Sequence, residues 1–318
     1  MKKLILSAAV LTTLFSCCGG ASSEKTEGGD SAQFSGTIQI DGSSTVFPIT
    51  EAVNEDFREV QPDIKTPTGH SGTGGGFKKF IRNEIDICDA SRPIKKGEAH
   101  ECDSLKIKYV ELEVAYDGLA IVVSSKNTWL TSITAAELKM LWEPEAQGKI
   151  TTWNQIRKEW PNQPIKLFGA GTASGTFDYF TEAINGKVQA CRGDYTASED
   201  DNVLVQGIAS DANALGFFGL AYFEENKDKL KLVAVDNGKG AVLPTTETVM
   251  NGTYAPLSRP LFIYVNGNAA KRPEVVSYVS YYLANTSRLA GEVGYISLPE
   301  AKTKEQIAKW DAFVKEVK

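Results

Sequence analysis

Three short loops of similar composition follow predicted strands and precede predicted helices. They read DGSST at 41–45, HSGTGGG at 70–76 and TASGT at 172–176. Apolar stretches with the periodicity of strands lie before them, and helical stretches lie after them. Repeated strand–loop–helix units predict an α/β fold with a mostly parallel sheet.

The elements expected around these loops are short. Strands are predicted at 37–40, 63–66, 85–87, 119–123, 165–168, 214–218 and 261–265. Helices are predicted at 46–60, 77–83, 137–142, 152–159, 204–210 and 274–283, with Pro48 tolerated because it falls in the first turn of its helix.

The composition of the three loops suits an anion. The first turn of a helix has unsatisfied backbone N–H groups and a partial positive charge. Glycine lets this backbone approach a ligand closely, and Ser and Thr hydroxyls add donors. Three such loops together could enclose a small tetrahedral oxyanion, although a single Ser or Thr at a helix start is usually an N-cap.

The same loops do not match the common enzyme motifs. A P-loop needs Lys and then Ser or Thr after its last glycine, whereas Gly76 is followed by Phe77 and Lys78. Ser174 stands where a dinucleotide motif has its third glycine, and it lies one place late for a G-x-S-x-G elbow. The chain has two histidines, His70 and His100. A serine hydrolase would need one of these histidines as its base, and no motif places either beside Ser174. We therefore expect no catalysis.

The first residues predict export. Lys2 and Lys3 precede an apolar run at 4–15, which is typical of a signal peptide over residues 1–16. The sequence LFSC ending at Cys17 resembles a lipobox, in which this cysteine carries lipid; a plain signal peptide is the alternative. Residues 17–34 are rich in Gly and Ser and predict a flexible tether. We expect a protein held by lipid at the outer, periplasmic or cell-surface side of a membrane.

Charge and cysteine content exclude other classes. The net charge is −6 and no run of basic residues is present, so a nucleic-acid partner is not expected. No His/Cys pattern predicts zinc, and no other metal or cofactor is expected. Cys88 and Cys102 could form a disulfide in an exported protein, or each could be a free buried thiol.

Several longer motifs carry a family resemblance. DGSSTVFPITEAV, SGTGGGFKKFI, IDICDASRPIK, ASGTFDYFTEAI and ALGFFGLAYF follow one another as in the PstS family of phosphate-binding proteins, from about residue 36 to VGYISLP at 293–299. The resemblance implies a type II periplasmic-binding-protein fold with two α/β lobes joined by a two-segment hinge. Lobe one would comprise 35–116 and 262–318, and lobe two 117–261. It also implies a monomer that delivers phosphate to the permease of an ABC importer, with the membrane contacted through the lipid anchor.

The resemblance also implies a ligand set. Hydroxyls and backbone amides of the three loops would hold phosphate, and the matching residues are Ser44, Thr45, Ser71, Thr73, Ser174, Gly175 and Thr176. Whether Ser71 or Thr73 takes the place in the second loop depends on how the glycines align.

Two charged positions differ from the pattern of the family. Arg92 stands where well-known members have an aspartate, and Ala170 stands where they have an arginine. Arg92 is therefore the expected cation, unless it forms a surface ion pair, and Arg192 is a weaker candidate. The candidate acceptors for the proton of phosphate, which sulfate lacks, are then Asp41, Asp89, Asp117 and Asp178, although such a residue is more often a helix cap or a solvated carboxylate.

The sequence leaves other functions open. Sulfate, molybdate or another oxyanion could be the ligand. More distant alternatives are a secreted serine-type hydrolase or phosphatase, and an adhesive or signalling surface protein that keeps the lobed fold.

Overall fold

The structure is a computed structural model that describes residues 33–172, 174–198 and 200–318. The chain divides into Met1–Gln33 and a compact unit, Phe34–Lys318. The predicted signal peptide, Cys17 and the tether as far as residue 32 lie outside the described residues. All helices and strands of the described residues belong to the compact unit.

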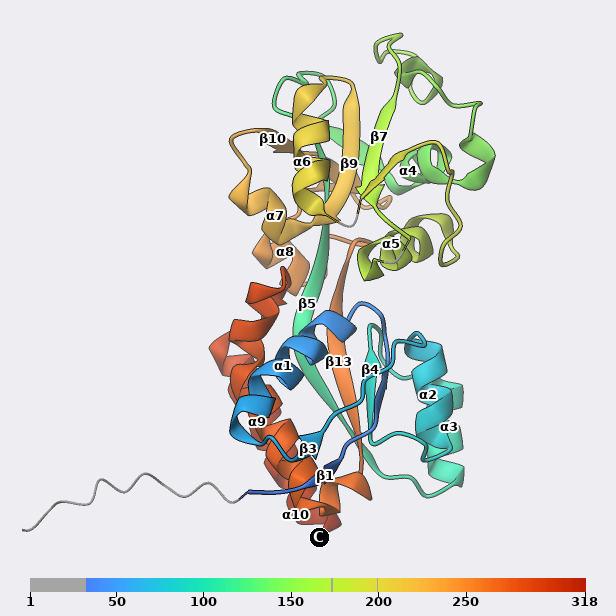
Figure 1. Cartoon of the computed structure of the whole chain (residues 1–318). Helices are drawn as coiled ribbons and strands as arrows, with labels where there is room; N and C mark the ends of the chain where they lie inside the picture. Colours follow the sequence, from blue (N-terminus) through green and yellow to red (C-terminus); the bar gives the residue numbers. More distant parts are fainter. Residues whose placement is uncertain (1–32, 173, 199) are drawn as a thin grey trace, which may run out of the picture. The chain divides into compact units, whose positions relative to one another are not determined.

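Helices and strands alternate along this unit (Figure 1). The helices are α1 (Phe47–Val60), α2 (Thr73–Ile81), α3 (Lys96–Ser104), α4 (Ala135–Trp142), α5 (Gly175–Phe180), α6 (Asp201–Ser210), α7 (Leu220–Glu225), α8 (Thr246–Met250), α9 (Pro273–Glu292) and α10 (Glu300–Val317). The strands are β1 (Gly36–Thr37), β2 (Ile40–Gly42), β3 (Ile64–Lys65), β4 (Ile87–Ala90), β5 (Tyr109–Ser124), β6 (Ser132–Thr134), β7 (Lys166–Ala170), β8 (Thr196–Ser198), β9 (Ala214–Gly219), β10 (Leu230–Leu232), β11 (Ala234–Asp236), β12 (Ala241–Val242), β13 (Ser258–Asn266) and β14 (Ile296–Ser297).

The main sheet is mixed. Its order is β2-β4-β13-β5-β9-β7-β8, and β10 and β14 also pair with β5. β2 is parallel to β4, and β7 is parallel to β8 and β9. The long strands β5 and β13 are antiparallel to each other; β13 is also antiparallel to β4, and β5 to β9. The α/β class is confirmed, whereas the prediction of a mostly parallel sheet is wrong because the chain passes along the middle of the sheet in both directions.

The two long strands connect two apolar cores. In Figure 1, β5 and β13 run between the parts that contain α1 and α6. Buried apolar residues from Tyr116 to Leu257, with Leu298, form what we call the middle core. Those at 38–115 and 261–314 form the terminal core and a smaller cluster beside it. The division into two lobes at 117 and 261 stays a prediction.

Helix α1 fixes the position of the first loop. Ile49, Val53 and Phe57 are spaced by four residues, so they share one face of the helix, and that face is buried. The ring of Phe57 meets that of Tyr278 on α9 edge to face, with centroids 5.2 Å apart. Pro48 lies in the first turn, as predicted. The loop before α1 is thus held by a helix that packs on the terminal core.

Three of the predicted helices differ clearly in the structure, and one of them is α9, which continues to Glu292 instead of ending at residue 283. Helix α2 begins at Thr73 rather than at residue 77, so it includes three glycines. A Cβ atom at Gly76 would lie 2.7 Å from the Cα of Gly42 and 2.8 Å from the Sγ of Cys88, so only glycine allows α2 to pack this closely. The helix predicted at 152–159 is a single 3-10 turn, Trp153–Gln155, at the start of which the side chain of Gln155 accepts from the backbone N–H groups of Thr151 and Thr152.

Candidate functional site

The first loop passes over the end of β4. The backbone N–H of Ser43 donates to the carbonyl of Asp89 at 2.9 Å. A Cβ atom at Gly42 would overlap that carbonyl, and Gly42 has a φ of +147°, which favours glycine. The hydroxyl of Ser43 accepts from the backbone N–H of Thr45 at 3.2 Å. These bonds fix Ser44 and Thr45 beside the carboxyl end of β4.

The first and third loops touch each other. The hydroxyl of Thr45 donates to the carbonyl of Gly175 at 3.3 Å, and that of Ser44 donates to Asp178 at 3.1 Å. A Cβ atom at Gly175 would lie 2.8 Å from the carbonyl oxygen of Ser44. Ser174 accepts from the N–H of Thr176 and so caps α5. The structure therefore brings Ser44, Thr45, Gly175 and the carboxylate of Asp178 together.

In the second loop, Ser71 and Thr73 have different partners. Ser71 donates both its backbone N–H, at 2.9 Å, and its hydroxyl, at 2.7 Å, to Asp41. Asp41 also pairs with Lys79 of α2. The hydroxyl of Thr73 instead lies 3.1 Å from that of Ser91 and accepts from the N–H of Ser91. Asp41 thus anchors the loop, and Thr73 faces the end of β4.

A cavity of about 580 Å³ lies among these loops, and we call it the basic cavity. The hydroxyl residues that line it are Ser43, Ser44, Thr45, Thr73 and Ser91. Its basic residues are Arg92, Lys95 and Arg259, and its acidic residues are Asp178 and Glu182. Hydroxyl donors and guanidinium groups in one cavity suit a small anion.

A second cavity, of about 380 Å³, borders the first. It is lined by Ser174, Gly175 and Thr176 and shares Ser44 with the basic cavity. The predicted ligand residues are thus divided between two adjoining cavities. Ser71 lines neither of these two cavities in the described part of the chain.

Arg92 lies in the basic cavity, but a carboxylate already binds it. Two of its nitrogens donate to Glu98 at 2.9 and 2.8 Å. Glu98 also accepts from the N–H of Lys95, which completes a capping box at the start of α3. The side chain of Arg92 is 25% exposed. The alternative of an ion pair is thus observed, whereas a role of Arg92 in binding phosphate stays a prediction.

Arg259 was not predicted from the sequence. It lies on β13 opposite Asp117 of β5 and donates to the hydroxyl of Thr45 at 2.8 Å. Its guanidinium carbon lies 3.5 Å from the ring centre of Tyr179. The loop motifs do not include Arg259, because it lies at the start of an apolar strand and not in a glycine-rich loop. Its one sequence signal is a charged residue beside a stretch that is otherwise expected to be buried.

Arg192, the weaker candidate for the cation, is bonded within the protein. Its guanidinium is buried, pairs with Asp194, and donates to the carbonyls of Leu141 and Ile150. In the described part of the chain it lines neither of the two cavities.

The four candidate aspartates differ in their surroundings. Asp178 lines the basic cavity, and its Oδ1 is buried with no hydrogen bond among the described residues. Asp117 lines the second cavity, and burial raises the pKa of its carboxyl. Asp89 is fully buried behind the first loop, and burial raises its pKa to about 8. At Asp41 burial opposes the shift, but hydrogen bonds from Lys79 and Ser71 lower the pKa.

Cys88 and Cys102 are both buried and free, so of the two alternatives left open by the sequence the structure has the free buried thiols. The Sγ of Cys88 points to α2, since it lies where a side chain at Gly76 would be, and it weakly donates to the carbonyl of Asp89. Burial raises the pKa of both thiols, to about 11 at Cys102.

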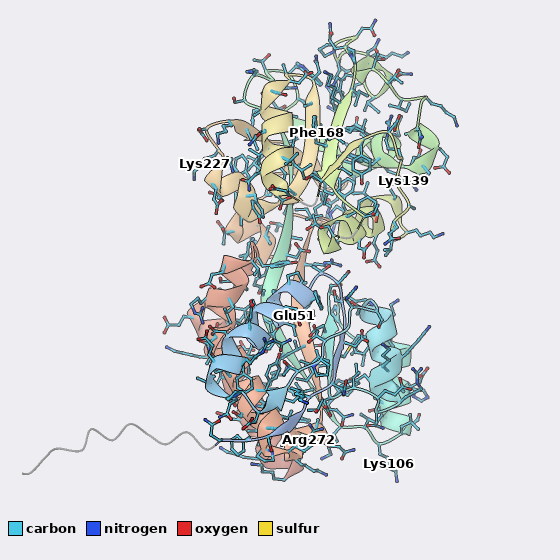
Figure 2. The ribbon with its side chains drawn as sticks, viewed as in Figure 1. Glu51, Lys106, Lys139, Phe168, Lys227 and Arg272 are labelled. Carbon is cyan, nitrogen blue, oxygen red and sulfur yellow. The ribbon has the colours of Figure 1, made fainter. Side chains whose placement is uncertain are left out.

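No group of three or more His, Cys, Asp and Glu in the described residues could hold a metal ion. No helix there is long and apolar enough to cross a bilayer. The basic residues labelled in Figure 2, Lys106, Lys139, Lys227 and Arg272, lie away from the loops that precede α1 and α5.

Known proteins resemble this chain in sequence and in fold. Residues 26–286 match the model of the PBP superfamily domain. The chain is 52% identical to the protein SphX of Synechocystis over 270 residues, 85% of this chain and 80% of the relative. It is 37% identical to the phosphate-binding protein PstS of Staphylococcus saprophyticus, over 95% of this chain and 91% of the relative.

A solved structure extends the comparison to the fold. The crystal structure of a possible phosphate binding protein from Planctomyces limnophilus is 49% identical and has a TM-score of 0.86, over 88% of this chain and 99% of that one. The predicted type II periplasmic-binding-protein fold is thereby confirmed. Such proteins are solute-binding proteins rather than a family of enzymes. The chain belongs to the PBP superfamily and, within it, to the PstS family of phosphate-binding proteins.

Proposed function

We propose that the chain binds inorganic phosphate outside the cytoplasm and delivers it to the permease of an ABC-type importer. The observation that carries this proposal is the basic cavity, where hydroxyls of Ser44, Thr45 and Thr73 meet the guanidinium groups of Arg92 and Arg259. The names of the relatives, which include phosphate-binding protein PstS, support phosphate as the anion.

Binding replaces the water around phosphate with fixed donors. The loops supply neutral hydroxyls and amides, and the guanidinium groups supply charge. Ser174, Gly175 and Thr176 line the adjoining cavity next to Ser44, and we propose that they reach the anion when the cleft closes around it. Ser71 acts through Asp41 by holding the second loop. A cleft of this kind closes by a hinge motion of β5 and β13.

Asp178 is the acceptor that favours phosphate over sulfate. Its Oδ2 accepts a hydrogen bond from the hydroxyl of Ser44. Its buried Oδ1 has no partner among the described residues, and we propose that it accepts a hydrogen bond from the protonated oxygen of phosphate. Sulfate at neutral pH has no proton to donate to Asp178, so the negative charges of sulfate and of the carboxylate would repel each other. This disfavours sulfate and molybdate as the physiological ligands.

Calorimetric titration of the full chain tests the proposal. After removal of bound anion, phosphate should bind with a Kd of micromolar or less, and sulfate should give no signal at the same concentrations. Asp178→Asn should lose phosphate affinity while gaining measurable sulfate binding. Tighter binding of sulfate than of phosphate by the unmodified chain would refute the proposal.

The remaining parts of the proposal concern chemistry and location. We propose that the protein performs no catalysis; turnover of a phosphoester that disappears in Ser174→Ala would contradict this. Lipid on Cys17 would hold a monomer at the outer face of the membrane, with residues 17–34 as a tether. Cys17→Ala should move the protein from the membrane fraction to the soluble exported fraction.

A further inference from the structure

The basic residues of the basic cavity differ in how far they are exposed to solvent. Lys95 is mostly exposed to solvent. Arg92 and Arg259 are largely covered, with side chains that are 25% and 14% exposed. Because burial strengthens electrostatic attraction, these two guanidinium groups are the ones that can neutralise an anion effectively.

Three of the five N–H donors of Arg92 are already bonded within the protein. Both of its strong bonds go to the two oxygens of Glu98, and a third goes to the carbonyl of Pro93. A bidentate guanidinium–carboxylate pair is close to neutral as seen from the cavity. An anion that took Arg92 would have to compete with Glu98 and would also disturb the start of α3.

Arg259 has the opposite character. Its Nε is buried and makes no hydrogen bond with the described residues. The Oδ2 of Asp117 lies 3.4 Å from that Nε, so the two charges form an ion pair, although its geometry does not satisfy either atom with a full hydrogen bond. Glu182 is 3.9 Å away and more than half exposed. A buried guanidinium with spare donors is costly unless an acceptor meets it.

The surroundings of Arg259 also connect distant elements. It projects from β13, bonds Thr45 in the first loop and covers the ring of Tyr179 on α5. Thr45 belongs to the loop that packs on the terminal core, and Tyr179 belongs to the middle core. The guanidinium thus contacts both sides of the junction between the first and third loops.

We infer that Arg259, rather than Arg92, supplies the charge that neutralises bound phosphate, and that it couples binding to the approach of the first and third loops. This rests on the proposed function. Phosphate takes the free donors of Arg259, while Tyr179 and Asp117 hold the guanidinium in place. Arg92 keeps its bond to Glu98 and shapes the wall of the cavity.

The test compares four variants of the full chain by calorimetry with inorganic phosphate. R259Q removes the charge, R259K keeps it without the planar fork, and R92Q removes the other guanidinium. R157Q is the matched control, because Arg157 also pairs with a carboxylate and lies 4.5 Å from the centre of an aromatic ring, that of Trp160. Thermal unfolding without ligand shows whether each variant is folded.

We expect phosphate affinity to fall about 100-fold or more in R259Q and about 10-fold in R259K. R92Q should lose no more than about fivefold, as expected for a residue whose charge is already balanced. R157Q should bind as the unmodified chain does. Ligand-free R259Q should have a lower melting temperature, because Asp117 loses its ion-pair partner, so binding is compared at a temperature well below that transition.

Three results would overturn the inference. One is a phosphate affinity of R259Q within threefold of the unmodified chain, and another is a larger loss in R92Q than in R259Q. The third applies if R259Q does not fold: a phosphate affinity of R259K equal to that of the unmodified chain would then overturn the inference. Failure of the unmodified chain to bind phosphate would instead refute the proposed function and the inference with it.

Discussion

Asp89 makes the stability of the fold depend on pH, and Asp89→Asn tests this. The side chain is fully buried; its Oδ2 accepts from the hydroxyl of Thr50 at 2.9 Å, and its Oδ1 has no hydrogen bond among the described residues. Tyr282 contacts the same Thr50 hydroxyl at 3.1 Å. Burial, with smaller contributions from the negative charges of Asp41 and Glu51, raises the pKa of Asp89 to about 8 despite the hydrogen bond from Thr50.

The sign follows from proton binding. The native state keeps the proton of Asp89 up to about pH 8, whereas the unfolded chain releases it near pH 4. Between these values the native state binds more protons, so the free energy of unfolding falls as pH rises. The slope is about 1.4 kcal/mol per pH unit, which amounts to about 2.7 kcal/mol between pH 5 and 7. Asp89→Asn has no such proton and should lack this loss.

Urea unfolding at pH 5, 6 and 7, followed by tryptophan fluorescence, measures the effect. The buffer must contain no phosphate, because a ligand that binds the native state would stabilise it. Relative to the unmodified chain, Asp89→Asn should gain about 2.7 kcal/mol between pH 5 and 7, and the exposed control Asp311→Asn should gain little. A difference between Asp89→Asn and the unmodified chain that stays constant over this range would refute the reasoning.

Three further predictions concern the loops and the thiols. Gly175→Ala should weaken phosphate binding about tenfold or more, because its methyl group would push the first loop away, whereas Gly97→Ala, which has open space around it, should bind normally in the same titration. Asp41→Asn should lower the free energy of unfolding by about 1–3 kcal/mol at pH 7. Since hydrogen bonds hold the folded pKa of Asp41 below its unfolded value although burial opposes them, that difference should shrink as the pH falls below 4 in urea titrations. Cys88 and Cys102 should resist a thiol reagent in the native protein and react after unfolding, and a native mass two hydrogens lighter would show a disulfide instead.

Local patterns predicted much of the fold. Helix α1 was found almost to the residue, because its buried face repeats every fourth position and Pro48 marks its start. Helix α2 was predicted to begin too late, since its glycines disfavour a helix in isolation. The reason for a glycine in this helix is visible only in the packing, where Gly76 lets the helix lie close against β2 and β4. The directions of β5 and β13 were equally hidden, because strand pairing depends on contacts that are distant in the sequence.

The candidate site shows the same limit. The hydroxyl loops could be found because each is a continuous motif. Arg259 could not, because its bond to Thr45 spans 214 positions and its own neighbours in sequence belong to a strand. Glu98 lies only six positions from Arg92, yet their pairing depends on how α3 begins. Charges that meet in a folded site are set by tertiary geometry, which a motif does not contain.

A crystal structure of the full chain with arsenate, a tetrahedral analogue of phosphate, tests the central claim most directly, because anomalous scattering locates the arsenic atom. Binding in the proposed mode predicts a single strong peak in the basic cavity, within hydrogen-bond reach of Arg259 and of the hydroxyls of Ser44 and Thr73. A peak outside this cavity, or a cavity without arsenic at saturating concentration, would contradict it.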